Sequence, residues 1–238
     1  MISFVVPAYN EELELPATLA SIKRAAEGAE QQFEVIVADD GSTDRTPEIA
    51  AAMGARVVPL NRRQIAAARN GGAREALGEI LFFIDADTRI TAAHVINALA
   101  ILRNGYAGGG ARMVLDGKVS PLARLWTGIF CVMYFGANLG AGAFLFTTRV
   151  NFKKTGGFDE RYFAGEEVYF TQALKKIGRF RLLKEPVVTS ARKLRMHSAR
   201  DILWQCIRIT LSGGRAVRTR EKLDIWYDGK RERVSAGS

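Results

Sequence analysis

The chain has 238 residues, of which 48% are hydrophobic and 25% are charged. This balance is ordinary for a globular protein, and it excludes disorder as the main state of the chain. The formal net charge of +9 indicates a partner that carries phosphates, such as a nucleotide, a nucleic acid or an anionic membrane.

The first half of the chain alternates apolar strands with helical segments. Strands are predicted at residues 2–6, 33–38, 56–60 and 79–84. Helices are predicted between them, at residues 12–26, about 43–53 (with Thr43 or Asp44 as the cap) and 65–76. This alternation predicts an α/β fold with a mainly parallel sheet and helices on both faces.

The second half of the chain has a less regular pattern. Strands are predicted at residues 107–115 and 143–147, and helices at residues 166–177 and 198–211. Neither an internal repeat nor a low-complexity linker marks a boundary. We therefore predict a single domain over residues 1–238, with a regular part at 1–115 and a less regular part at 116–238.

One long apolar run needs separate treatment. No charged residue occurs between Arg124 and Arg149, and such a stretch is long enough to cross a bilayer. The run is interrupted by several glycines and by Asn138, so we interpret it as buried core followed by a Gly-rich loop. A membrane span is the alternative.

The N-terminus and the two cysteines bear on the cellular location. The N-terminus leads straight into a strand, which is not the pattern of a signal peptide. Cys131 and Cys206 lie in apolar surroundings without metal-ligand spacing, so we expect two buried, reduced thiols. Neither cysteine calls for an oxidising compartment, and we expect a cytoplasmic protein.

Polar clusters follow three of the predicted strands. They occupy residues 7–11, 39–44 and 85–87. In an open parallel sheet, ligands bind beyond the carboxyl ends of the strands. Each cluster alone has a plainer explanation, as a turn, a helix cap or a surface acidic pair, but together they converge on one edge of the sheet.

The third cluster carries the residue types of a metal site. Asp85 and Asp87 can offer oxygens to one Mg²⁺ or Mn²⁺ ion, which typically takes one or two carboxylates plus substrate phosphates. Such an ion neutralises the charge that builds on a diphosphate leaving group. Arg69, on the preceding helix, adds a positive charge, although a solvated helix face is an equally good reading of it.

Four motifs in this order resemble glycosyltransferase family 2. They are VVPAYNE at 5–11, ADDGSTD at 38–44, ARNG at 68–71 and FIDAD at 83–87. Further along, GGFDE at 156–160 and GEEVYF at 165–170 look like acceptor-side motifs of the same family. The resemblance covers roughly residues 1–195, and the set is specific although each piece alone is weak.

The resemblance implies a GT-A type fold, a nucleoside-diphosphate sugar as donor, Mn²⁺ or Mg²⁺ as cofactor and inversion at the anomeric carbon. The part at 1–115 becomes the nucleotide-sugar-binding half, and 116–238 the acceptor-side half. The resemblance places the nucleoside against Pro7, Ala8, Tyr9 and Glu11, with Asp39 or Asp40 on its base or ribose and Arg69 close to the nucleotide. It makes Asp87 the main metal ligand, with Asp85 nearer the ribose or sugar.

The resemblance also implies a general base on the acceptor side. Family members usually carry an Asp second in an acidic pair at a helix start, and here that pair is Glu166 and Glu167. Glu167 takes the place of the Asp, which leaves open whether it or Glu166 is the base. Stabilisation of the helix N-terminus by both carboxylates is the plainer alternative.

Two further features are ambiguous from the sequence. His197 is either a metal ligand, as a late histidine is in some GT-A enzymes, or a surface residue beside two arginines. The segment at 140–143, GAGA, allows either close approach of a sugar to the backbone or tight packing.

The basic C-terminal segment indicates a location. The predicted helix at 198–211 is amphipathic, and Lys and Arg residues from Arg192 to Arg220 surround it. Such a helix can lie on an anionic membrane, so we expect peripheral contact with the inner face of the membrane and an acceptor that is lipid-linked. Packing of the apolar face on the sheet is the alternative.

Other functions fit the sequence less well. The first strand is not followed by the Gly-rich loop of a dinucleotide-binding enzyme or a P-loop, and no nucleic-acid recognition motif supports that reading of the charge. A non-catalytic nucleotide-sugar-binding domain and a sugar nucleotidyltransferase on a similar sheet are the alternatives to a transferase.

Overall fold

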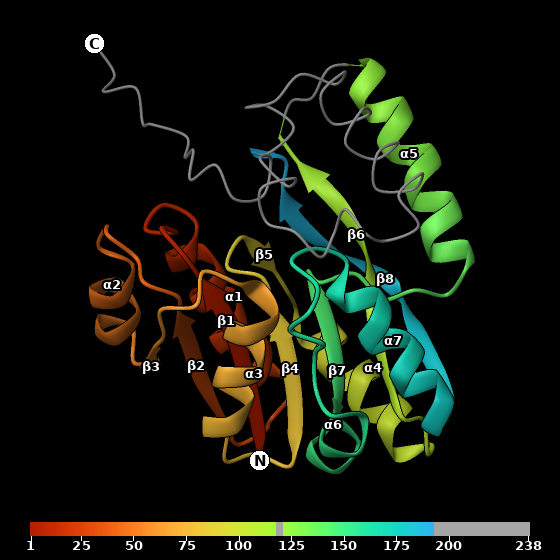
Figure 1. The fold of residues 1–238 in the computed structure, drawn as a ribbon, viewed down its shortest axis with the longest axis horizontal. Helices are drawn as coiled ribbons and strands as arrows, with labels where there is room; N and C mark the ends of the chain where they lie inside the picture. Colours follow the sequence, from red (N-terminus) through yellow and green to blue (C-terminus); the bar gives the residue numbers. More distant parts are fainter. Residues whose placement is uncertain (118–120, 193–238) are drawn as a thin grey trace.

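The computed structural model describes residues 1–117 and 121–192, and the strands of these residues form one mixed sheet (Figure 1). The order across the sheet is β3-β2-β1-β4-β7-β6-β8-β5. The strands are β1 (Ile2–Ala8), β2 (Phe33–Asp39), β3 (Arg56–Pro59), β4 (Ile80–Ile84), β5 (Thr88–Arg89), β6 (Gly108–Asp116), β7 (Phe144–Thr148) and β8 (Phe180–Ser190).

The sheet has a parallel part and a part in which the strand direction changes. Strands β3, β2, β1 and β4 run parallel, as predicted. β7 is antiparallel to both β4 and β6, β8 is parallel to β6, and β5 is antiparallel to β8. The last pairing joins Thr88 to Thr189, so the chain beyond residue 180 reaches the end of β4, where the acidic pair lies.

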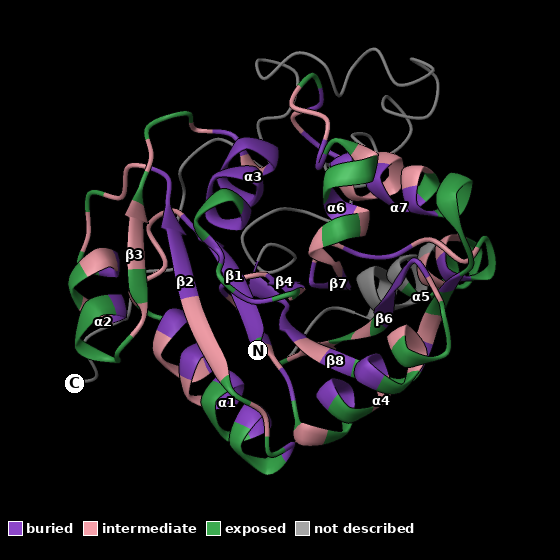
Figure 2. Cartoon of the chain, turned by 90° about the horizontal axis from the view of Figure 1, so that it is seen from below, coloured by how far each residue is buried: buried purple, intermediate pink, exposed green. Residues whose placement is uncertain are grey.

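Helices cover both faces of the sheet, which confirms the predicted α/β architecture (Figure 2). The helices α1 (Leu15–Gly28) and α4 (Ala92–Arg103) pack on one face, and α3 (Ile65–Glu75), α6 (Arg149–Thr155) and α7 (Glu166–Ile177) pack on the other. Successive side chains of a strand point to opposite faces. Phe82 and Ile84 therefore join the first core, and Leu81 and Phe83 join the second.

Helix α3 packs directly on the sheet at Gly72, where a side chain would not fit. A Cβ atom on Gly72 would lie 2.5 Å from Val5 Cγ1 and 3.3 Å from Ala38 Cβ. The absence of side chains at this point lets the helix settle onto β1 and β2. This close packing brings Arg69, one turn earlier, to the carboxyl end of the sheet.

Several elements differ from the prediction or were not predicted. Helix α2 (Thr46–Ala52) begins after Arg45 without a side-chain cap, and Asp44 instead accepts a hydrogen bond from the Thr46 amide at 3.0 Å. The short β5 and the elements α4, α6 and β8 were not predicted. β8 was missed because Lys184, Glu185 and Pro186 interrupt its apolar pattern.

The apolar run after Arg124 was interpreted as buried core followed by a Gly-rich loop, and this is right only for its second part, where residues 143–146 are buried. Its first part belongs to helix α5 (Pro121–Gly136), on which Ile129, Val132 and Met133 are 42%, 75% and 65% exposed. None of the helices within the described ranges is long and apolar enough to cross a membrane. Cys131 on this helix is half-buried and unpaired, as a free thiol.

Several predictions fall on residues 193–238, outside the described part. They concern Cys206, His197 and the helix at 198–211. The single domain over residues 1–238 also stays a prediction.

Candidate active site

The loops after β1 and β2 are joined at the carboxyl edge of the sheet. The Asp40 amide donates to the carbonyl of Ala8 at 2.8 Å, and the Glu11 amide donates to Thr46 Oγ1 at 2.7 Å. Asn10, whose φ of +53° lies in the left-handed region, accepts from the Thr43 amide at 2.7 Å. The first two predicted clusters therefore form one continuous surface.

The two aspartates at the end of β2 have different partners. The carboxylate of Asp40 accepts from the backbone amides of Arg62 and Gln64 at 2.7 and 2.6 Å, so it holds the loop before α3. Asp39 is also buried, and in the described part of the chain its Oδ1 has no hydrogen-bond partner. A buried acceptor of this kind is costly unless something binds to it, so Asp39 is the better candidate for contact with a ligand.

Pro7 and Ala8 are buried at the end of β1, and Tyr9 is partly exposed beyond them. The Arg63 guanidinium carbon lies 3.5 Å from the centre of the Tyr9 ring, a cation–π contact. The ring is thereby held at the rim of the surface formed by the two loops.

A buried arginine joins the end of β4 to the start of α7. The Arg69 side chain is 1% exposed, which rules out the reading of a solvated helix face. Its Nη2 donates to Asp85 Oδ1 at 2.7 Å and to the Gly142 carbonyl at 3.3 Å, and its Nη1 donates to Glu166 Oε1. Burial alone would lower the pKa of Arg69, but the charges of Asp85 and Glu166 outweigh it and raise the pKa.

The Gly-rich segment before β7 packs directly on this arginine. A Cβ atom on Gly142 would lie 2.5 Å from Arg69 Nη2, which leaves no room for a side chain. The geometry thus supports tight packing at this position.

Glu166 and Glu167 are neighbours with different surroundings. Glu166 is 2% exposed and paired with Arg69. Glu167 is half-buried, and the hydroxyl of Tyr134 on α5 lies 3.5 Å from its Oε1. Loss of hydration, and next the charge of Glu166, raise the pKa of Glu167 to about 8 against the opposing charge of Arg69. Glu167 therefore has the proton affinity expected of a base that works near neutral pH.

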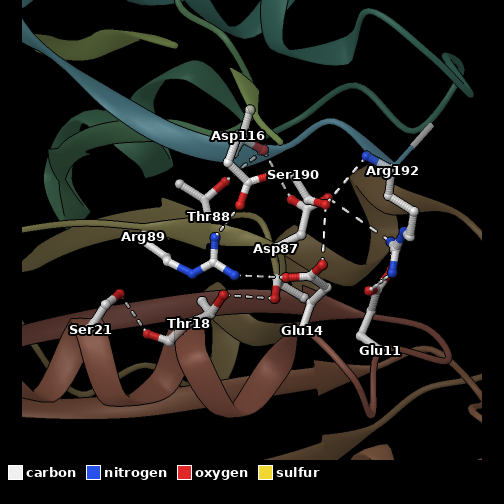
Figure 3. Close-up of polar contacts among 12 residues, drawn as sticks. Glu11, Glu14, Thr18, Ser21, Asp87, Thr88, Arg89, Asp116, Ser190 and Arg192 are labelled. Carbon is white, nitrogen blue, oxygen red and sulfur yellow. Dashed lines mark hydrogen bonds and ion pairs between the residues drawn. The ribbon is translucent and has the colours of Figure 1, made fainter. Parts of the chain in front are cut away.

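Asp87 lies in a separate charged cluster at the start of α1 and the ends of β5 and β8 (Figure 3). Its Oδ1 accepts from Thr189 Oγ1 at 3.2 Å, and its Oδ2 lies 4.0 Å from Arg192 Nη2. Arg192 makes two hydrogen bonds of 2.8 Å to the carboxylate of Glu11. Arg192 is buried, so it does not belong to the basic surface that the sequence suggested for it.

One carboxylate of this cluster is available to a divalent ion. Asp87, whose side chain is 16% exposed, can supply a carboxylate oxygen, whereas Asp85 is engaged by Arg69. Within residues 1–117 and 121–192, no group of three His, Cys, Asp or Glu side chains could hold a metal ion without other ligands. This arrangement fits an ion that takes few protein ligands and completes its shell with phosphate oxygens and water.

Comparison with known proteins shows the family of this chain. Residues 3–143, more than half of the chain, match the family model described as "Glycosyl transferase family 2". The chain belongs to this family. Its match with the model ends before α7 and β8, so Glu166, Glu167 and Arg192 lie beyond it.

Curated relatives in this family share part of the chain. An undecaprenyl-phosphate 4-deoxy-4-formamido-L-arabinose transferase of Aeromonas hydrophila is 34% identical over 113 residues, which are 44% of this chain and 35% of the relative. A 4,4'-diaponeurosporenoate glycosyltransferase of Staphylococcus haemolyticus is 35% identical over 116 residues, 45% of this chain and 30% of the relative. The matches thus span about a third of each relative's length.

Solved structures of glycosyltransferases have the same fold. S. aureus TarS 1–349 in complex with UDP matches with a TM-score of 0.61 at 22% identity, over 80% of this chain and 60% of that one. The mannosyltransferase PcManGT from Pyrobaculum calidifontis, in complex with GDP-Man and Mn²⁺, matches with a TM-score of 0.61 at 19% identity, over 93% of this chain and 64% of that one. These similarities confirm the predicted GT-A type fold.

The sequence anticipated most of the carboxylates of this site but missed two residues. Arg192 follows a strand that the sequence did not predict, and Tyr134 lies in the run that was interpreted as core. A lone arginine or tyrosine carries no motif, so no sequence signal pointed to either.

Proposed function

We propose that the protein transfers a sugar from a nucleoside-diphosphate sugar to an acceptor hydroxyl with inversion at the anomeric carbon. The observation that carries the proposal is the buried Arg69, which ties Asp85 at the donor end to Glu166 beside the candidate base. Membership of family 2 and the sugar-nucleotide complexes of the structural neighbours support the same donor class.

Glu167 is the base in this proposal, and Glu166 is a positioning residue. The acceptor oxygen attacks the anomeric carbon while its proton passes to Glu167, and the bond to the diphosphate breaks with its electron pair going to the leaving group. The pKa of about 8 at Glu167 supports the assignment, because a carboxylate of raised proton affinity takes a hydroxyl proton more readily. The salt bridge with Arg69 holds the Glu166 side chain in place at the first turn of α7.

The donor is assigned to the surface formed by Pro7, Ala8, Tyr9 and Glu11 and the buried Asp39. Asp39 Oδ1 accepts a hydrogen bond from the base or the ribose, which satisfies an oxygen that lacks a donor among the described residues. Asp87 holds the metal, Mn²⁺ or Mg²⁺, which when bound neutralises charge on the diphosphate leaving group. Asp85, fixed by Arg69, faces the ribose or the sugar.

The acceptor is proposed to be lipid-linked, with the protein in peripheral contact with an anionic membrane. Exposed apolar side chains on α5 support this, because Ile129, Val132 and Met133 are carried by the same helix as Tyr134, whose hydroxyl approaches Glu167. An exposed apolar surface on this helix suits an acceptor with a hydrocarbon part. The name of the Aeromonas hydrophila relative, with its undecaprenyl phosphate, points to the same class.

Thermal unfolding with a panel of sugar nucleotides, each with and without Mn²⁺, tests the donor assignment. The correct donor raises Tm by mass action, and its slow hydrolysis releases the nucleoside diphosphate. A non-catalytic binding domain would show the rise in Tm without release of the nucleoside diphosphate. If no sugar nucleotide in the panel raises Tm, the proposed donor class is wrong.

A further inference from the structure

The Arg192 guanidinium lies where the proposed metal end of the site meets the nucleoside loop (Figure 3). The residue follows β8, and its side chain is 4% exposed. Its Nη1 and Nη2 each donate to one carboxylate oxygen of Glu11 at 2.8 Å, and Nη2 also lies 4.0 Å from Asp87 Oδ2. One buried cation thus faces the proposed metal ligand and a residue assigned to the donor.

The surroundings of this cation are acidic. Glu14 and Asp116 lie in the same cluster, where both pair with Arg89 at 3.1 and 2.5 Å. Ser190 Oγ, at the end of β8, donates to Glu14 Oε1 at 3.1 Å and so holds the strand end against α1. Arg89 forms ion pairs with Glu14 and Asp116, whereas Arg192 forms an ion pair with Asp87.

We propose that Arg192 is an internal countercation of the donor-free site, which a divalent metal must displace from Asp87. The inference rests on the proposed function through the role of Asp87 as the metal ligand. A guanidinium and a divalent ion beside one partly buried carboxylate repel each other, and little water is present to screen them. The arginine stabilises the acidic cluster without metal, and for the same reason it lowers the affinity of Asp87 for metal.

The arginine has a second property that fits displacement. Within the described ranges, its buried Nε–H has no acceptor. A guanidinium that leaves Asp87 offers this donor, together with its charge, to an anion such as a diphosphate. Metal binding and diphosphate binding then favour each other. The metal displaces the guanidinium toward the diphosphate, and a diphosphate that binds the guanidinium removes its repulsion of the metal.

The test measures Mn²⁺ binding without nucleotide, from the electron paramagnetic resonance signal of free Mn²⁺. Arg192→Gln should bind Mn²⁺ about 10- to 1,000-fold more tightly than wild type, the range by which one nearby charge alters the proton affinity of a carboxylate. Arg89→Gln is the matched control, since it makes the same change in net charge within the cluster at an arginine that pairs with Glu14 and Asp116, and its effect should be much smaller. Adding Asp87→Asn to Arg192→Gln should abolish the gain.

An Arg192→Gln variant that is folded and binds Mn²⁺ no better than wild type, or no better than Arg89→Gln, would overturn the inference. A second measurement on the wild-type protein covers the case in which the variant does not fold. The Arg192 Nε–H resonance, assigned by its loss in Arg192→Lys, should shift or lose its protection from exchange as Mg²⁺ saturates the protein, and an unchanged resonance at saturation would refute displacement.

Failure of the proposed function gives a different result. If Asp87→Asn takes up Mn²⁺ together with the sugar nucleotide as wild type does, Asp87 is not the metal ligand and the inference falls with that assignment. If Asp87→Asn loses this uptake while Arg192→Gln is unchanged, the metal assignment stands and only the role of Arg192 is wrong.

Discussion

Glu166 accepts a hydrogen bond from Arg69, a residue 97 positions earlier in the chain, and both side chains are almost completely buried. The pair commits Glu166 to a structural position at the start of α7. Glu167, which turns toward Tyr134 instead, is left with a raised pKa. The proposed function therefore assigns a positioning role to Glu166 and the role of base to Glu167.

Glu167→Gln should lower kcat by roughly 100- to 10,000-fold, the usual contribution of general-base catalysis, while the affinity for the sugar nucleotide is kept. Steady-state transfer assays together with donor binding by calorimetry measure both quantities.

Glu166→Gln is the matched comparison, and its expected defect is in stability. Removing one member of a buried ion pair costs about 3 kcal/mol, at the lower end of the usual range because Asp85 still pairs with Arg69. Chemical denaturation measures this loss. An inactive but fully stable Glu166→Gln, beside an active Glu167→Gln, would reverse the two assignments.

The pKa of about 8 at Glu167 predicts opposite effects of pH on activity and stability. Activity should rise with pH through about 8, because the base must be ionised. Stability should fall as pH rises from the ordinary carboxyl value of 4.5 to about 8, since over that window the folded state holds a proton that the unfolded state has released. Glu167→Gln should lack this decline, so the variant should gain stability relative to wild type at pH 9 but not at pH 4. Unfolding curves for both proteins across this pH range measure the difference. If the stability of the variant and that of wild type depend on pH in the same way, the raised pKa of Glu167 is contradicted.

The two aspartates after β2 should respond differently to the same substitution. Asp39→Asn should weaken binding of the sugar nucleotide with little change in Tm, because its Oδ1 has no partner within the described residues. Asp40→Asn should lower stability by roughly 1–3 kcal/mol, because Asp40 accepts from two backbone amides. If both variants lose binding and stability to the same extent, the assignment of ligand contact to Asp39 and of loop stabilisation to Asp40 is wrong.

The proposed membrane contact predicts the effect of changes on α5. Val132→Ser with Met133→Ser should reduce sedimentation with anionic vesicles and leave donor binding unchanged, since both side chains are exposed. Ile96→Ser on α4, which is 50% exposed, is the control. Neutral vesicles should bind the wild type weakly, and salt should weaken binding to anionic ones. Identical sedimentation of all three proteins would exclude α5 from the contact.

The sequence predicted the first half of the fold well, because the strand ends and helices there have regular patterns. The buried strands β1, β2 and β4 and the helix α3 follow local apolar periodicity, and α7 has the predicted bounds. The acidic clusters were expected at one edge because parallel strands align their carboxyl ends. The partners of Arg69 and Asp87 could not be predicted in this way, since they come from residues 16 to 105 positions away and depend on where β7 and β8 join the sheet.

The sequence did not predict the surroundings of α5 or the existence of β8, because the hydrophobic pattern of each segment does not reflect which of its side chains are covered. The run containing α5 is apolar in composition, and composition alone does not distinguish a core helix from one whose Val132 and Met133 face outward. β8 carries charged residues and a proline because part of it lies at a weakly covered region of the sheet, where its side chains at Lys184 and Glu185 are exposed.

The buried guanidinium of Arg69 also has a consequence for how the chain must be synthesised and folded. The nucleotide motifs are complete by residue 87, but Arg69 receives its contacts from Gly142 and Glu166 only when much later residues have been made. Strand β4 likewise lacks its neighbour β7 until residue 148. A fragment that stops at residue 115 would therefore carry every donor motif together with an exposed strand edge and a half-compensated internal charge. We therefore expect that the contiguous stretch that is easiest to recognise in the sequence does not fold by itself.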